Sequence, residues 1–262
     1  MSFGVALCGA GVALLVCVAL RLMVGPTAVG LPELPDGVSA WSVFEVRGQR
    51  VWPAVLVGGS LALSGVALQG LLRNVLAEPF VLGLASGAWL GAAVQATVAA
   101  AAGWWSGPLY AGAAVGAFAA LGVVFALGRR RGVIDPLGLL LAGVVVGTIA
   151  GSGVMVLRQV SGSVVLRDRI ANWGMGYLQA ESAGWLLAAV AAVCVASGVW
   201  LWWVARWMDA ASLGEEEAEA MGVPLGRLRA GLLVVASVLA AGAVVLSGPV
   251  AFVGLIAPHA AR

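Results

Sequence analysis

The hydrophobic positions of this chain form long uninterrupted runs, unlike the alternating or helically spaced patterns of soluble proteins. A run of about 20 apolar residues is long enough to cross the hydrocarbon core of a bilayer as a helix. We therefore expect membrane-spanning helices at 4–24, 51–72, 79–102, 107–127, 133–157, 183–205 and 230–246. This pattern predicts an all-α protein with seven spans.

One further apolar segment lies between Pro249 and Pro258 near the end of the sequence. Its length is about 14 Å at 1.5 Å per helical residue, which is too short to cross a core of about 30 Å. We expect a partial eighth helix, broken by its prolines and lying near the outer face of the membrane.

Composition supports the membrane assignment and excludes several kinds of chemistry. Hydrophobic residues make up 62% of the chain and charged residues 10%, against about 25% charged in soluble domains. All 14 basic residues are arginines, so no Walker A lysine is present and this chain does not hydrolyse ATP in the P-loop manner. The single histidine and three scattered cysteines predict no catalytic residue and no metal site.

The arginines also predict how the chain crosses the membrane. Arg129, Arg130 and Arg131 form the densest basic cluster, which the positive-inside rule places in the cytoplasm. Counting helices from this loop puts the segment 158–182 outside and the segment 206–229 inside. The outer segment is too polar to span, and its Trp173 and Tyr177 suit the membrane interface.

The inner segment has the pattern of a short helix-turn-helix. Ser212 is a candidate N-cap, the acids 215–217 suit a first helical turn, and Gly222 is a candidate terminator. Pro224 suits the start of a second short helix. The alternative is a solvated acidic loop.

A faint internal repeat links two distant segments. LALSGVALQGLL (61–72) resembles VVLSGPVAFVGLI (244–256), and the two lie on spans expected to run in opposite directions. Inverted repeats of this kind are common in transporters, whose two faces open alternately.

Two longer motifs contain these segments. They read LSGVALQGLLRNVLAEPFVLGLASGA (63–88) and GPVAFVGLIAPHAAR (248–262). Together they resemble the signatures of the FecCD family, the permease subunits of ABC importers for iron-siderophores, haem and vitamin B12. The signature positions are Gln69, Asn74, Glu78, Pro79, Gly248, Pro249, Pro258 and His259. Val75 departs from the pattern, because the family has proline there.

The resemblance implies the type II ABC importer permease fold, a single transmembrane permease domain over 1–262, and a location in the bacterial cell membrane. The family has about ten helices, so the resemblance implies that this chain is truncated at its C-terminus. It also implies a homodimer working with a substrate-binding protein outside and two ATPase subunits that use ATP inside, with no cofactor bound by this chain. The expected cargo is a ferric siderophore carried by alternating access. Haem or cobalamin import and a non-transporting fragment are the alternatives.

The resemblance also suggests roles for individual residues. Arg47 and Arg50 correspond to arginines that dock the binding protein, although they also suit simple snorkelling at the interface. The coupling segment that meets the ATPase would contain Leu213, Gly214, Glu215, Glu216, Ala218, Met221 and Gly222. The segment Asn172, Trp173, Gly174 and Gly176 would lie beneath the docked binding protein.

The fifth expected helix carries Gly143, Gly147 and Gly151 at intervals of four residues. Such a stripe either packs closely against another helix or, by family resemblance, lines the translocation path. These two interpretations remain open.

Two other classes of function fit the sequence less well. A membrane-embedded enzyme needs a cluster of ionisable residues at membrane depth, and an ion-coupled secondary transporter usually needs intramembrane acids. No Asp or Glu lies in the middle of any expected span. ATP-driven transport is therefore favoured.

Overall fold

A computed structural model describes residues 3–24, 40–103, 109–130, 133–134, 136–178 and 184–261. Within these residues the chain is almost entirely helical. The elements are α1 (Phe3–Met23), α2 (Ala40–Gln49), α3 (Val51–Leu72), η1 (Pro79–Leu82), α4 (Leu84–Ala101), α5 (Tyr110–Leu127), β1 (Arg129–Arg130), β2 (Val133–Ile134), α6 (Pro136–Val160), α7 (Val164–Gly174), α8 (Gly184–Leu213), α9 (Glu215–Ala220), α10 (Leu225–Ser247) and α11 (Val253–Ala261). The strands form one two-residue antiparallel pair.

The structure confirms an all-α polytopic protein. Six helical segments among the described residues are long and apolar enough to span a membrane, and α1 adds a further apolar helix of 21 residues. The expected span 51–72 coincides with α3. The expected span 79–102 is wrong at its start: Gly83 adopts φ +70°, and this left-handed residue separates the 3-10 turn η1 from α4.

Two helices extend beyond the apolar runs that predicted them. Helix α8 continues to Leu213 and α10 already begins at Leu225. Of the expected pair of short helices in 206–229, the first is present as α9, with Glu215–Glu217 in its first turn, and the second is wrong, because it is the start of the long helix α10. Ser212 is not a cap, because its hydroxyl donates to the carbonyl of Asp209 inside α8 (2.6 Å). A helix continues past the membrane surface wherever its residues favour helix, and hydropathy does not detect that continuation.

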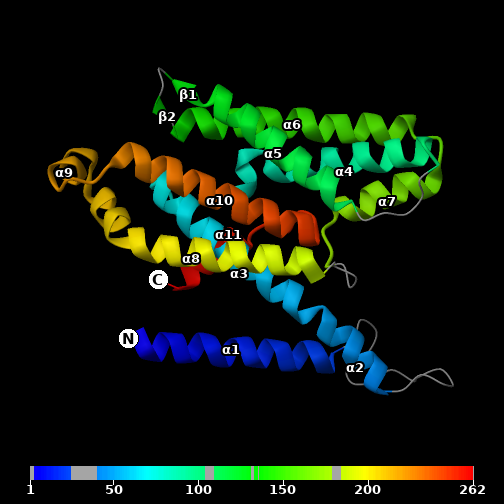
Figure 1. The fold of residues 1–262 in the computed structure, drawn as a ribbon, viewed down its shortest axis with the longest axis horizontal. Helices are drawn as coiled ribbons and strands as arrows, with labels where there is room; N and C mark the ends of the chain where they lie inside the picture. The colour runs from blue at the N-terminus through cyan, green and yellow to red at the C-terminus, as the bar shows by residue number, and fades with distance from the viewer. Residues whose placement is uncertain are drawn as a thin grey trace.

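The two ends of the bundle carry different elements (Figure 1). Helix α9 and the β1–β2 hairpin lie at one end, and α2 and α7 lie at the other. This arrangement agrees with the predicted sides of the membrane for 158–182 and 206–229. Arg131, Arg262 and the parts of the expected outer loops at 25–39 and 179–183 lie outside the described residues.

Helices α4 and α5 cross at paired glycines. A Cβ atom added to Gly91 would lie 2.0 Å from the carbonyl oxygen of Gly112, and one added to Gly116 would lie 2.2 Å from that of Gly87. Gln95 strengthens the crossing, because its Oε1 accepts a hydrogen bond from the N–H of Gly112 (2.6 Å). Membrane helices associate through such close packing, because lipid removes the hydrophobic driving force between them.

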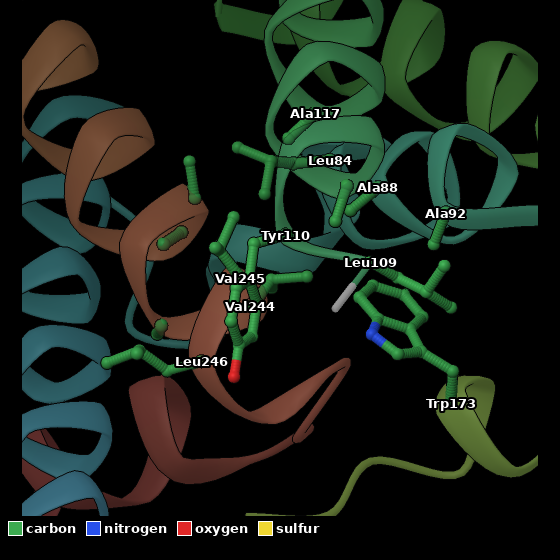
Figure 2. Packing of buried hydrophobic residues seen from close by; sticks show 14 of the residues in the cluster. Leu84, Ala88, Ala92, Leu109, Tyr110, Ala117, Trp173, Val244, Val245 and Leu246 are labelled. Carbon is green, nitrogen blue, oxygen red and sulfur yellow. The ribbon is translucent and has the colours of Figure 1, made fainter. Parts of the chain in front are cut away.

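The buried side chains form two clusters, one toward each end of the bundle. The first joins α4, α5 and α10 to Trp173 of α7. Figure 2 shows Leu84, Tyr110, Val244 and Trp173 among the residues of this cluster. The second joins α3, α6, α8 and α10 to Ala218 of α9. Both α7 and α9 are thus anchored in the transmembrane core by buried side chains.

Candidate functional site

The two sequence motifs meet where α11 packs against α3. Gly65 and Gly254 touch backbone to backbone: a Cβ atom on Gly65 would lie 1.9 Å from the carbonyl oxygen of Gly254. The ring of Pro79 lies on the other side of Gly254, 2.8 Å from where its Cβ would be. Residues almost two hundred positions apart in the sequence thus form one joint, which we call the α3–α11 joint.

This contact corrects the expected position of the last helix. The expected break at Pro258 is wrong, because α11 runs through this proline from Val253 to Ala261. The expected place of this helix near the outer face is also wrong, since α11 lies along the second half of α3. The turn after α3 belongs to the α9-end core, where Ala77 and Leu82 cluster with Ala218. The position of α11 depends on the packing of Gly254 against α3 and against Pro79 of η1. Hydropathy does not identify these partners.

Gln69 provides the polar contact in the α3–α11 joint. Its side chain is only 3% exposed, and its Nε2 donates to the carbonyl oxygens of Gly254 (3.5 Å) and Leu255 (3.4 Å). Gln69 is therefore a buried donor facing the first turn of α11, which gives this signature residue a definite structural partner.

Glu78 holds the entrance to α11. Its Oε1 accepts a hydrogen bond from the backbone N–H of Phe252. Phe252 adopts φ +69°, a left-handed conformation that is unfavourable for a bulky residue. The glutamate thus stabilises a strained backbone turn at the point where the chain enters α11.

The remaining signature residues complete the turns around the joint. Asn74 accepts a hydrogen bond from the N–H of Leu76 through its Oδ1 (2.9 Å), which closes the turn that follows α3. Pro258 is buried inside α11. His259 is exposed, and its ring has no hydrogen-bond partner among the described residues. The expected hydrogen-bonding role of His259 at a helix end is therefore not observed.

At the opposite end, the segment after α7 packs onto the end of α10. A Cβ atom on Gly176 would lie 2.3 Å from the carbonyl oxygen of Pro249, and one on Gly248 would lie 2.6 Å from that of Trp173. Gly174 packs against the indole of Trp89, whose Nε1 donates to Ile170 (2.8 Å). This segment is therefore built for backbone packing, and Trp173 itself is buried.

The two expected docking arginines have different environments. Arg47 is 7% exposed, and its guanidinium donates to the carbonyl of Leu22 at the end of α1 (2.6 Å). Arg50 is exposed where α2 meets α3. Arg50 is thus available to a partner at this end of the molecule, whereas Arg47 ties α1 to α2.

Tryptophans on α8 indicate where the membrane lies. Trp185 is exposed near the start of the helix, and Trp202 and Trp203 are exposed in its second half. Trp185 and Trp203 are about 27 Å apart at 1.5 Å per residue, close to the thickness of a hydrocarbon core. Because tryptophans favour both membrane interfaces, the last turns of α8 and all of α9 lie beyond the bilayer.

The expected coupling segment is a small unit attached to the bundle at two points. Ala218 is fully buried in the α9-end core. Glu215 forms an ion pair with Arg229 of α10, with 2.5 Å between Oε1 and Nη2. Leu213, Glu216 and Met221 are exposed, Gly214 is the N-cap and Gly222 ends the turn with φ +78°. The unit is therefore held firmly while part of it remains accessible.

The glycine stripe of α6 mainly serves packing. A Cβ atom on Gly143 would lie 2.2 Å from the carbonyl oxygen of Val81 in η1, and Gly147 faces Gly83. No atom lies within 4 Å of the corresponding point on Gly151. A neighbouring face of α6 instead contributes Val146, Ile149 and Ala150 to an apolar groove shared with α4 and α5.

Several contacts were missed by sequence reasoning. Arg229 and Phe252 were not singled out, and Gln95 was not connected to the glycines of α5. The spacing of Gly87, Gly91 and Gln95 at four-residue intervals, opposite Gly112 and Gly116, was the available signal for the α4–α5 crossing. No comparable signal marks the pairing of Arg229 with Glu215.

Comparison with known proteins gives consistent matches along the chain. A model described as the FecCD transport family matches residues 13–262. The cobalamin import system permease protein BtuC of Halobacterium salinarum is 37% identical over 238 residues, covering 90% of this chain and 62% of the relative. The hemin transport system permease protein HmuU of Yersinia pestis is 34% identical, covering 85% and 66%. The molybdate import system permease protein MolB of Haemophilus influenzae is 32% identical, covering 87% and 66%.

A solved structure supports the same fold. It is a metal-chelate type ABC transporter in an inward-facing conformation, with a TM-score of 0.80 and 27% identity, covering 98% of this chain and 80% of that chain. The chain spans between 62% and 66% of the length of the three relatives above. With the six apolar helices, these matches identify a multi-pass protein of the bacterial cell membrane.

Proposed function

Because this chain belongs to the FecCD transport family, we propose that it is a permease domain of an ATP-driven importer. The domain would carry substrate from an outer binding protein to the cytoplasm by alternating access. The observation that carries the proposal is the family match over residues 13–262. ATP hydrolysis is assigned to a separate partner, since this chain has no lysine for a Walker A loop.

The proposed contact with the ATPase is α9 together with the residues that flank it. Its support is the position of α9 beyond the tryptophans of α8 and its two attachments, Ala218 in the core and Glu215 on Arg229. Glu216 and Met221 are exposed and available to a partner. A unit anchored in this way transmits movement, because a displacement of α9 also displaces α8 and α10.

The proposed contact with the binding protein lies at the other end of the bundle. Arg50 is exposed there, and α7 lies at the same end of the bundle. Exposed ion pairs contribute about 0 to 1 kcal/mol each, so Arg50 would serve mainly in steering and register. We propose that the transporter is a homodimer, with one copy of α9 for each of two ATPase subunits.

The proposed cargo is a ferric siderophore, and haem or cobalamin are the alternatives. All three are large chelates, and the solved structure similar to this chain is a metal-chelate type transporter. Two of the relatives are named for cobalamin and hemin, and a third is named for molybdate. The binding protein is expected to choose among them.

The test is reconstitution of the full-length gene product with the ATPase and binding protein encoded beside it. We expect uptake of radiolabelled ferric siderophore, hemin or cobalamin into liposomes to require ATP. An ATPase whose Walker A lysine is replaced by alanine is the matched control. Uptake that persists with this control, or that follows an imposed ion gradient, would overturn the proposal in favour of ion-coupled transport.

A further inference from the structure

The inference starts from the proline inside α11. In an α-helix the N–H of each residue donates to the carbonyl four positions earlier. Pro258 has no N–H, so the carbonyl of Gly254 loses its partner within the helix. Gly254 and Pro258 are both buried. The sequence of α11 therefore creates an unsatisfied acceptor inside the protein.

Such an acceptor is costly where water is absent. A buried polar group without a hydrogen bond destabilises a protein, and it does so more strongly in hydrocarbon. Prolines occur in membrane helices where neighbouring groups satisfy the carbonyls that they free. The neighbour in this fold is α3, and Gly65 allows it to approach α11 closely.

The side chain of Gln69 reaches this carbonyl. Its Nε2 lies 3.5 Å from the oxygen of Gly254 and 3.4 Å from that of Leu255. Both neighbours are acceptors, so only the NH2 end of the amide suits them. The carbonyl of Leu255 lies four positions before His259, whose N–H is present, so Gly254 is the acceptor that the helix itself leaves unpaired.

We propose that Gln69 is a positioning residue, which replaces from α3 the hydrogen bond that Pro258 removes from α11. The pair explains why α11 packs where it does. A helix with an intact hydrogen-bond ladder would need no donor from α3, whereas this helix is satisfied only in the register that places Gly254 beside Gln69. The proposal does not depend on the cargo or on the source of energy.

The test is a double-mutant cycle in the full-length protein. Gln69→Leu removes the donor, and Pro258→Ala restores the N–H within α11. We expect Gln69→Leu to lower the Tm of the detergent-purified protein by roughly 2–8 °C and to reduce its uptake. Adding Pro258→Ala should recover most of both losses, because the carbonyl of Gly254 regains a partner.

The matched control is Gln95→Leu. It removes a different buried glutamine contact, the one to Gly112, and Pro258→Ala should not repair that loss. Equal recovery in the Gln69 and Gln95 backgrounds would reflect general helix stabilisation and would overturn the proposal. So would a Gln69→Leu/Pro258→Ala protein with the same Tm as Gln69→Leu.

If Gln69→Leu fails to accumulate in membranes, accumulation becomes the measurement. Recovery of membrane levels by Pro258→Ala supports the pairing. Continued failure of the double variant, when Pro258→Ala alone accumulates normally, overturns it.

Discussion

Glu78 and Phe252 are joined by a hydrogen bond although 174 positions separate them in the sequence. The bond connects the turn after α3 to the turn before α11. We predict that Glu78→Ala destabilises the protein by about 0.5–1.5 kcal/mol, because the exposed turn at Phe252 loses a hydrogen bond. Glu78→Gln retains an acceptor oxygen and should cost less. Thermal unfolding of the purified variants measures both effects, and equal losses would contradict a role for this hydrogen bond.

The backbone of Phe252 offers an independent test of the same turn. Its left-handed conformation costs about 1–2 kcal/mol for a residue with a side chain, and glycine avoids that cost. The ring is 60% exposed, so little packing is lost on its removal. We therefore expect Phe252→Gly to raise the Tm relative to Phe252→Ala, in which the strain remains. A lower Tm for the glycine variant would show that backbone strain at Phe252 does not limit the stability of the protein.

The contact between Gly65 and Gly254 predicts opposite effects for two substitutions on α3. Gly65→Ala would place a methyl group against the carbonyl of Gly254, so we expect a loss of about 1–3 kcal/mol or more. Gly58→Ala meets no atom within 4 Å and should gain about 0.5–1 kcal/mol from its better helix propensity. Unfolding in detergent compares the two. Similar Tm values would contradict the close approach of α11.

The ion pair between Glu215 and Arg229 should matter more for coupling than for stability. Exposed pairs contribute about 0–1 kcal/mol, and Glu215 is 57% exposed. We expect Arg229→Met to change the Tm little and to reduce ATP-driven uptake a few-fold, since α9 loses an attachment. The reversed pair, Glu215→Arg with Arg229→Glu, should recover uptake.

Arg227 is the matched control for this experiment, because it is an exposed arginine on the same helix that makes no ion pair with the described residues. Arg227→Met should leave uptake unchanged. An equal decrease in the uptake of both variants would indicate a general effect of removing a positive charge from this end of α10.

The exposed tryptophans of α8 predict which part of this helix contacts lipid. Lipids brominated on their acyl chains should quench the fluorescence of Trp202 and Trp203, which are exposed at one end of the span. Replacing both with Phe should reduce the quenched fraction, and replacing the buried Trp173 should not. No difference between these variants would place α8 away from lipid.

The sequence predicted most spans because hydrophobic runs bounded by charge are a local property. Helix α3 lies between Arg50 and Arg73, and its ends were predicted correctly. The break at Gly83 was missed, because an apolar glycine does not interrupt a hydropathy pattern. Helix α8 was predicted too short because its last two turns leave the membrane without leaving the helix.

The contacts of the candidate site were harder to predict. The motif residues Gln69 and Pro258 were recognised individually, but their relation depends on how α11 lies against α3. Arg47 illustrates the same limit, since an arginine near a helix end is equally compatible with exposure and with the carbonyl of Leu22. Tertiary packing determines whether such an arginine is exposed or buried, and a single sequence does not show how the helices pack.

The contact between α3 and α11 has a consequence for the assembly of the protein in the membrane. Gly65 and Gln69 of α3 are synthesised almost two hundred residues before Gly254, which they contact in the folded protein. The surface of α3 that receives α11 therefore exists before α11 leaves the translocon. Biogenesis of the joint is thus a templated step, in which an earlier span acts as the acceptor for a later segment.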